Sequence, residues 1–429
     1  MTQTNAKTAV TLGIDSLSYG PYGIGRLDGK AMMIRHTAPG DVVEARVLGA
    51  KASYAIGELT RVIKPSPVRQ TPPCPYVPAC GGCTWQHLQY AAQLKAKQQS
   101  VEDALRRIGK LTGYELRPII PSPLEYHYRR RIRLQIAPGG KLGYCGAASR
   151  QVVEIDSCWI ADQRLNRAIE IARAWLGRLR TPIEELELVC GDEPGQLVLV
   201  ARAAGALVPS DQVENEKLVQ GHGAPLAVIV RGKDWRKAWG NPAIRLRLTG
   251  ELSLDVDADV FTQVNPAGNR RMVSELLDQA QLQTSDRVLE LYSGAGNFTL
   301  PIAERCGEVT AVEGDRRSLA NAKRNAQKNG LENIRWICSA VPAAVARLRR
   351  RREKFLKIVL DPPRAGAKGL EADLAALGAE RLIYVSCNPT TLARDLAALA
   401  KLGYKTKSVQ PIDLFPQTYH VESLAVVER

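Results

Sequence analysis

The sequence predicts a multidomain fold with a small amino-terminal β-barrel, a mixed α+β central domain and a carboxy-terminal α/β domain. Three patterns predict it. Short strands broken by glycine fill residues 1–66, mixed strand and helix patterns fill residues 67–255, and apolar strands alternate with helices over residues 256–429. Such alternation indicates a doubly wound, largely parallel sheet. We therefore expect three domains with these boundaries.

The first 66 residues carry alternating apolar positions with turn signals at short intervals, as in VTLGIDSLSYGPYGIGRLDGK. This spacing is typical of a small β-barrel, and the segment resembles OB-like barrel domains. Pro65, Pro67, Pro72 and Pro73 follow and indicate a stiff linker into the central domain.

The central region begins with a loop rich in cysteine. CPYVPACGGC holds Cys74, Cys80 and Cys83, and Cys158 follows in EIDSCWIAD. The proline and glycine around them indicate a loop rather than a core strand, which argues against four unrelated buried cysteines. Four thiolates bind either zinc or an iron–sulfur cluster. Three clustered ligands with one distant ligand favour the cubane, while zinc stays open.

The carboxy-terminal region carries a nucleotide-type loop. VLELYSGAGNFTLPIA places Gly294 and Gly296 between an apolar strand and a helix start. The third glycine of a dinucleotide fingerprint is replaced by Thr299, so NAD is disfavoured. The next strand, EVTAVEGD, ends at Glu313, whose carboxylate suits both hydroxyls of a ribose. These features fit an adenosyl ligand.

Two later strands also end in reactive residues. FLKIVLDPPRAG ends at Asp361 and LIYVSCNPTTLARDL ends at Cys387. Because the carboxyl ends of neighbouring strands meet at one edge of such a sheet, we expect one cleft that holds a cofactor beside a nucleophilic cysteine.

The sequence resembles the RNA 5-methyluridine (uracil-C5) methyltransferases, in the branch that modifies large-subunit ribosomal RNA. The motifs are FTQVNPAGNRRM, LELYSGAGNFTL, VLDPPRAG, VSCNPTTLARDL and FPQTYHVESLAVV. The resemblance implies a TRAM barrel, a Rossmann-like domain that binds S-adenosylmethionine, Cys387 as nucleophile and Glu422 as base. It also implies a 4Fe-4S cluster on the four cysteines. The implied cofactor-binding residues are Gln263, Tyr292, Gly294, Asn297, Glu313 and Asp361.

The chemistry explains the need for a cysteine and a carboxylate. Carbon 5 of uracil is a weak nucleophile until a thiolate adds to carbon 6 and forms an enolate. A base must then remove the carbon 5 proton before the thiolate can leave. Thiolate formation needs a positive neighbour, and Arg364 and Arg394 are candidates.

Charge indicates a polyanionic partner. The chain has 59 basic and 44 acidic residues and a formal net charge of +15, which favours RNA. The cluster YHYRRRIRL predicts an RNA surface, with Tyr126 and Tyr128 for stacking. Its basic residues are Arg129, Arg130, Arg131 and Arg133. A second cluster, RLRRRREKFLK, is equally consistent with a solvated helix face.

No apolar run is long enough to span a bilayer, so we expect a cytoplasmic protein without membrane contact. We also expect a monomer. The predicted substrate is large-subunit (23S) rRNA, and tRNA is the alternative. A third hypothesis is a non-catalytic RNA-binding protein with a degenerate methyltransferase fold. Cys387, Glu422 and Asp361 together argue against it.

Overall fold

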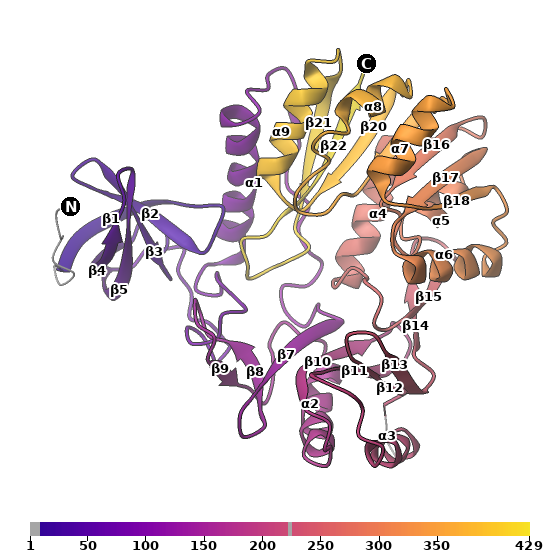
Figure 1. Cartoon of the computed structure of the whole chain (residues 1–429). Helices are drawn as coiled ribbons and strands as arrows, with labels where there is room; N and C mark the ends of the chain where they lie inside the picture. Colours follow the sequence, from indigo (N-terminus) through magenta and orange to yellow (C-terminus); the bar gives the residue numbers. More distant parts are fainter. Residues whose placement is uncertain (1–8, 222–224) are drawn as a thin grey trace.

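The computed structural model describes residues 9–221 and 225–429, which form a closed barrel and three further sheets (Figure 1). The barrel lies to one side, and the central seven-stranded sheet lies below the carboxy-terminal eight-stranded sheet. Within the described residues, no helix has both the length and the apolar character needed to cross a bilayer.

The amino-terminal barrel confirms the prediction of a small β-barrel. Its strands close in the order β1-β2-β3-β5-β4 around Leu12, Ile14 and Ile34. Gly25 is needed for this closure, since a side chain there would collide with the Gly13 carbonyl oxygen. The strands are β1 (Ala9–Leu17), β2 (Tyr22–Leu27), β3 (Lys30–Arg35), β4 (Val42–Ala50) and β5 (Tyr54–Lys64).

The central sheet has the order β13-β12-β11-β10-β7-β8-β9 and is packed by two helices, α2 (Gln163–Leu176) and α3 (Asp211–Gln220). The elements are β7 (Arg131–Ala137), β8 (Lys141–Cys145), β9 (Val152–Glu154), β10 (Ile183–Cys190), β11 (Leu197–Ala203), β12 (Ala227–Arg231) and β13 (Arg236–Gly240).

The carboxy-terminal sheet has the order β18-β17-β16-β19-β20-β22-β21-β6. Its strands are β16 (Arg287–Leu291), β17 (Glu308–Glu313), β18 (Ile334–Cys338), β19 (Lys357–Leu360), β20 (Arg381–Ser386), β21 (Lys405–Ile412) and β22 (Glu422–Glu428). Its helices are α4 (Pro266–Ala280), α5 (Thr299–Ala303), α6 (Arg316–Lys328), α7 (Val341–Arg350), α8 (Glu371–Ala376) and α9 (Pro389–Ala400). The five strands β16 to β20 are parallel, and β22 pairs antiparallel with β20 and β21.

Two elements from early in the chain belong to this same layer. Helix α1 (Tyr90–Arg107) packs against α9, and β6 (Glu115–Leu116) extends the sheet beyond β21. The apolar spacing of α1 predicts a helix, and Val101 and Leu105 are buried in the core of the carboxy-terminal sheet.

A small two-stranded hairpin lies between the central domain and the carboxy-terminal domain in sequence. Strands β14 (Ala243–Arg247) and β15 (Ser253–Asp257) pair with each other and pack against α6. Asn321 and Asn325 of α6 accept hydrogen bonds from the amides of Asp257 and Asp255, at 3.0 and 2.8 Å. The hairpin therefore holds the chain that leads into FTQVN at a defined place beside the sheet.

Candidate active site

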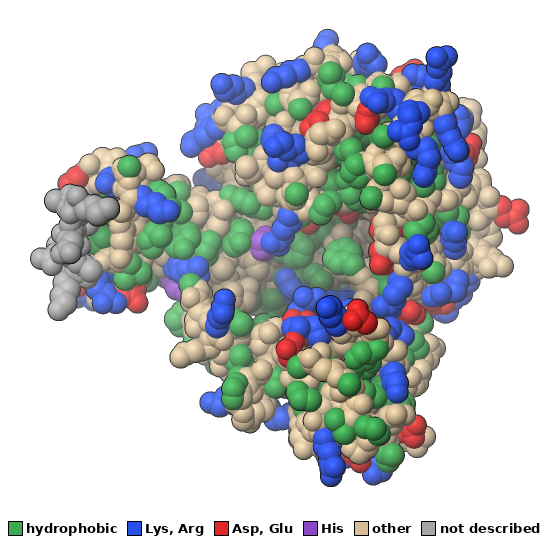
Figure 2. Space-filling model, in the orientation of Figure 1, with side chains coloured by type: hydrophobic (Ala, Val, Ile, Leu, Met, Phe, Trp, Pro, Cys, Tyr) green, Lys and Arg blue, Asp and Glu red, His purple; other side chains and the backbone are tan. Residues whose placement is uncertain are grey.

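A cleft of about 820 Å³ lies between the carboxy-terminal sheet and the central domain. It appears as the hollow at the centre of Figure 2, with basic side chains along its lower rim. The carboxyl ends of β16, β17, β19 and β20 contribute to its wall, as expected for a doubly wound sheet. The size is that of a typical small-molecule site.

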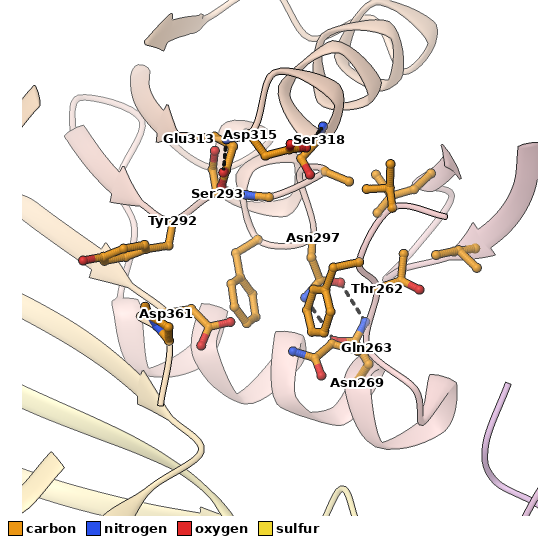
Figure 3. A pocket seen from close by; sticks show the side chains of 18 of the residues that line it. Thr262, Gln263, Asn269, Tyr292, Ser293, Asn297, Glu313, Asp315, Ser318 and Asp361 are labelled. Carbon is orange, nitrogen blue, oxygen red and sulfur yellow. Dashed lines mark hydrogen bonds between the residues drawn. The ribbon is translucent and has the colours of Figure 1, made fainter. Parts of the chain in front are cut away.

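The glycine-rich loop forms one side of this cleft (Figure 3). Tyr292, Gly294 and Gly296 have positive φ angles of 65°, 57° and 99°, so the loop turns sharply after β16. A side chain at Gly296 would lie 2.7 Å from Leu300 of α5. The Glu313 carboxylate accepts from the amides of Gly294 and Asp315, at 2.9 and 2.7 Å. Glu313 is thereby fixed at the edge of the cleft.

The FTQVN segment faces this loop from across the cleft. Gln263 lines the cleft, and the amide groups of Asn297 and Asn269 exchange two hydrogen bonds of 2.7 and 3.0 Å. The hydroxyls of Ser293 and Thr262 are buried without a hydrogen-bond partner in the described structure. Because buried hydroxyls are normally paired, these two indicate that the cleft is shaped for a polar ligand.

Cys387 and Glu422 come together at the base of the cleft. Cys387 follows β20 directly, and Glu422 begins β22, which pairs antiparallel with β20 so that Ser386 faces Ser423. This register places residues 387 and 422 beside each other although they lie far apart in sequence. Both line the cleft, together with Asp361 at the end of β19.

The base of the cleft disfavours negative charge. Burial, and then the nearby Glu422, raise the pKa of the Cys387 thiol to about 11. Burial and the Asp361 carboxylate raise the pKa of Glu422 to about 8, and burial raises that of Asp361 to about 7. Arg364 is the positive group that opposes these shifts for Cys387 and Glu422. Acidic groups with raised pKa values in a cleft are a feature of catalytic sites.

Comparisons with known proteins agree with this geometry. Residues 247–429 match the family model described as tRNA (Uracil-5-)-methyltransferase, and residues 8–60 match the TRAM domain. The 23S rRNA (uracil(1939)-C(5))-methyltransferase RlmD of Acidithiobacillus ferrooxidans is 35% identical, covering 97% of this chain and 96% of that protein. RlmD of Aeromonas hydrophila is 34% identical, covering 97% and 95%.

The chain belongs to the S-adenosylmethionine-dependent RNA (uracil-C5)-methyltransferase family. A solved structure with the same fold is the tRNA (uracil-54, C5)-methyltransferase of Pyrococcus abyssi in complex with S-adenosyl-L-homocysteine. The TM-score is 0.75 at 23% sequence identity, with 97% of this chain and 99% of that chain covered.

Several residues of the methyltransferase cleft escaped the sequence analysis. Phe415 and His420 line the cleft from the segment before β22, and burial with the nearby Arg364 lowers the pKa of His420 to about 4. Tyr19 of the barrel donates a hydrogen bond to the Cys387 carbonyl oxygen. His420 is part of the HVES motif, so the sequence offered a signal for it. No sequence pattern indicated that Tyr19 would contact Cys387.

The cysteine loop forms a second, smaller cavity of about 60 Å³ in the methyltransferase. It is lined by the four predicted ligands Cys74, Cys80, Cys83 and Cys158. Burial raises the pKa of the Cys80 thiol to about 11 and that of Cys83 to about 12, and the charge on Cys158 adds to both shifts. Within the described residues, no group of three or more His, Cys, Asp or Glu side chains is arranged to hold a metal ion.

The predicted RNA surface at YHYRRRIRL needs correction. Arg130 is 3% exposed and pairs with Asp192 at 3.2 Å, and Arg131 pairs with Glu187 at 2.6 Å. Arg129 lines the cysteine cavity, and of the four side chains Arg133 is the exposed one. The four arginines therefore do not form one exposed surface.

The physical reason is strand geometry. Successive side chains of β7 alternate between its faces, and β10 brings its own acidic residues opposite it, with Glu187 facing Arg133. Tyr128, expected to stack on bases, is also buried and donates to the Pro416 carbonyl oxygen at 3.0 Å. The stacking prediction for Tyr128 is wrong.

Proposed function

We propose that this protein transfers the methyl group of S-adenosylmethionine to carbon 5 of a uridine in large-subunit rRNA, through a covalent adduct with Cys387. The observation that carries the proposal is the meeting of Cys387 and Glu422 at the base of a cleft whose far side is the nucleoside-type loop. A thiol and a carboxyl are the two groups that the reaction requires.

The steps follow from these two side chains. The Cys387 thiolate forms a bond to carbon 6 of uracil, and the ring electrons move to an enolate. Carbon 5 then forms a bond to the methyl group, while the bond from the methyl to the sulfonium sulfur breaks and its electron pair stays on sulfur as a neutral thioether. Glu422 removes the proton from carbon 5, and the carbon–sulfur bond breaks to return the thiolate and the 5,6 double bond. S-adenosylmethionine, when bound, supplies an electrophilic methyl group on a sulfonium.

Six residues are proposed to hold that cofactor. They all line the cleft, and the unpartnered Ser293 and Thr262 hydroxyls beside them support a polar ligand. Glu313 is suited to the ribose because backbone amides already orient its carboxylate. The proposed residues are Gln263, Tyr292, Gly294, Asn297, Glu313 and Asp361.

The resting thiol needs help to ionise. With a pKa of about 11 for Cys387 and about 8 for Glu422, both groups hold their protons near neutral pH. Arg364 is proposed to favour both ionised forms. Arg394 has a different role, because it pairs with Asp395 at 2.7 Å.

The four cysteines that line the smaller cavity are proposed to hold a 4Fe-4S cluster. The fit rests on the donor set: one cavity is lined by four cysteines, and burial together with the charge on Cys158 raises the pKa values of Cys74, Cys80 and Cys83, so the ionised thiols need cations. We propose a structural role, since methyl transfer from a sulfonium involves no electron transfer.

Large-subunit rRNA is favoured over tRNA by the relatives. Several relatives named as 23S rRNA enzymes are 32–35% identical across nearly the whole chain. We propose three units, with a TRAM barrel at 1–66, a central domain at 67–255 and the methyltransferase domain at 256–429. The barrel and the exposed Arg133 are proposed to contact RNA, which reaches the cleft by flipping its uridine.

The test uses RNA labelled with tritium at carbon 5 of uracil. Anaerobically purified protein and S-adenosylmethionine are incubated separately with unmodified 23S rRNA and unmodified tRNA, and released tritium is counted. We expect release from rRNA, and none with Cys387→Ala. RNA binding by that variant should stay within about twofold of wild type, because the thiol adds little contact area.

Release from tRNA alone would overturn the rRNA assignment and keep the chemistry. Release by Cys387→Ala at the wild-type rate would overturn the covalent mechanism. No release from either RNA, by protein shown to contain iron and sulfide, would favour the non-catalytic RNA-binding hypothesis.

A further inference from the structure

The loop between β1 and β2 brings Tyr19 of the barrel into contact with the catalytic cysteine. The Tyr19 hydroxyl donates to the carbonyl oxygen of Cys387 at 3.0 Å, across 368 positions of sequence. Its ring lies edge-on to Tyr419 with centroids 5.6 Å apart, and Tyr419 in turn contacts His420 at 4.2 Å. Tyr19 thus touches both segments that supply the catalytic pair.

The Cys387 carbonyl is a sensitive place for such a bond. Cys387 is the single residue between β20 and Asn388, the N-cap of α9. The Leu392 amide donates to the Asn388 carbonyl at 3.0 Å, so the helical ladder begins after Cys387. A donor on the Cys387 carbonyl fixes the following peptide plane, and with it the direction of the thiol.

The barrel is attached to the rest of the chain by other contacts. The Asp41 carboxylate accepts from the Ser66 amide at 2.9 Å and from Arg69 at 2.7 Å. The ring of His87 contacts the Thr37 carbonyl oxygen at 3.1 Å, and Ala38 packs on Trp85. These anchors lie on the linker side of the barrel. Loss of the Tyr19 hydroxyl should therefore leave the barrel docked.

The surroundings of Tyr19 match a role at the reaction centre. The groups that act on its phenol are Cys387, Glu422, Tyr419 and Arg364, and burial with the first three raises its pKa, so the hydroxyl keeps its proton and stays a donor. A neutral donor to a carbonyl serves over the whole working pH range.

We propose that Tyr19 is a positioning residue for Cys387, through which the docked barrel sets the orientation of the nucleophile. The inference rests on the proposed function, because it requires Cys387 to attack uracil. It assigns the barrel a part in the rate of adduct formation in addition to RNA binding.

The test measures adduct formation directly. Transcripts of 23S rRNA made with 5-fluorouridine form an adduct that persists, since fluorine at carbon 5 is not removed as a proton would be. With saturating RNA and S-adenosylmethionine, the adduct is counted over time on a denaturing gel. For Tyr19→Phe we expect the rate to fall about three- to tenfold, the range that one hydrogen bond supports.

RNA affinity and folding are measured on the same samples. The RNA Kd and the thermal midpoint of Tyr19→Phe should match wild type, since the ring and the barrel anchors are kept. Tyr22→Phe is the matched control, because Tyr22 ends the same loop and packs under Arg35 within the barrel. Its adduct rate should equal that of wild type.

Three outcomes separate the possibilities. An adduct rate for Tyr19→Phe equal to that of Tyr22→Phe and wild type would overturn the positioning role alone. A weakened RNA Kd with an unchanged rate at saturation would make Tyr19 an RNA contact and also overturn it. Absence of any adduct with the wild-type protein would instead overturn the proposed function.

Discussion

Cysteine side chains line two cavities of the described structure, and the two cavities differ in what surrounds the sulfur. Cys387 lies in an 820 Å³ cleft with two carboxyl groups and Arg364. The four cysteines of the central domain line a 60 Å³ cavity and face one another. Burial raises thiol pKa values in both.

The difference shows how the neighbouring groups can distinguish the proposed nucleophile from the proposed ligand set. A single thiol beside one arginine can ionise transiently and attack a substrate that enters the open cleft. Several thiols around one small cavity can ionise together when cations neutralise them. The segment 413–420 joins the two regions, since Trp85 and Tyr128 near the cysteine cavity donate to the carbonyls of Gln417 and Pro416.

The largest effect should come from Glu422→Gln, which tests the carboxyl half of the cleft. We expect turnover to fall about 10³- to 10⁴-fold, because the amide cannot remove the carbon 5 proton. A methylated protein–RNA adduct should then accumulate on a denaturing gel. Glu428→Gln at the other end of β22 is the control and should turn over normally. A Glu422→Gln enzyme that releases product at the wild-type rate would exclude Glu422 as the base.

Lys97→Met tests whether the buried ion pair between Lys97 and Asp413 of the segment 413–420 stabilises the fold. Lys97 donates to Asp413 at 2.7 Å, and both side chains are fully buried. Removing the cation should lower the free energy of unfolding by about 3–5 kcal/mol, measured by denaturant titration. Lys97→Met with Asp413→Leu should recover most of this loss, and the exposed Lys95→Met should be neutral. Equal stability of the single and double variants would contradict the account.

Cys158→Ser tests the cavity lined by the four cysteines. Loss of one proposed ligand should lower the iron and sulfide content and cost about 2 kcal/mol or more of stability, because ligand binding stabilises the folded chain. Cys145→Ser, at the exposed end of β8, should keep the wild-type iron and sulfide content and the wild-type stability. Full iron content in Cys158→Ser together with unchanged stability would remove Cys158 from the ligand set.

Arg364→Gln should have the smallest effect of the four variants, a modest loss of kcat/KM near neutral pH. In the free enzyme kcat/KM should rise with pH from 6 to 9, since Glu422 with a pKa near 8 and Cys387 with a pKa near 11 must both lose protons. Removing the positive charge raises both pKa values, so the rise should move to higher pH. We expect about a threefold loss at pH 7, limited by solvent screening of an exposed arginine. The control Arg351→Gln should leave the profile unchanged, and an unshifted profile for Arg364→Gln would exclude its electrostatic role.

Much of the fold and the cleft could be predicted because the signals are local. Apolar runs and turn residues predict the strand that leads to Cys387 and the glycine loop that contains Gly296. The rule that such strand ends share one edge then brings Asp361 and Glu313 into the same site. The barrel was predicted in the same way.

The arginines show why other predictions failed. Charge is visible in YHYRRRIRL, whereas the Glu187 and Asp192 that neutralise Arg131 and Arg130 come from strand and loop residues about 60 positions later. Cross-strand partners are decided by register, which no local pattern records.

The amino-acid sequence by itself determined the strand ends, including the one at Cys387, the glycine loop and the cysteine spacing, because each depends on residue type and near neighbours. The proposed role of Glu422 came from the family resemblance of the HVES motif. Only the tertiary structure decided that Glu422 lies beside Cys387, that the arginine cluster is largely buried and that Tyr19 reaches Cys387. These depend on strand pairing and domain docking across long sequence separations, where burial and hydrogen bonding of the whole chain select the partners.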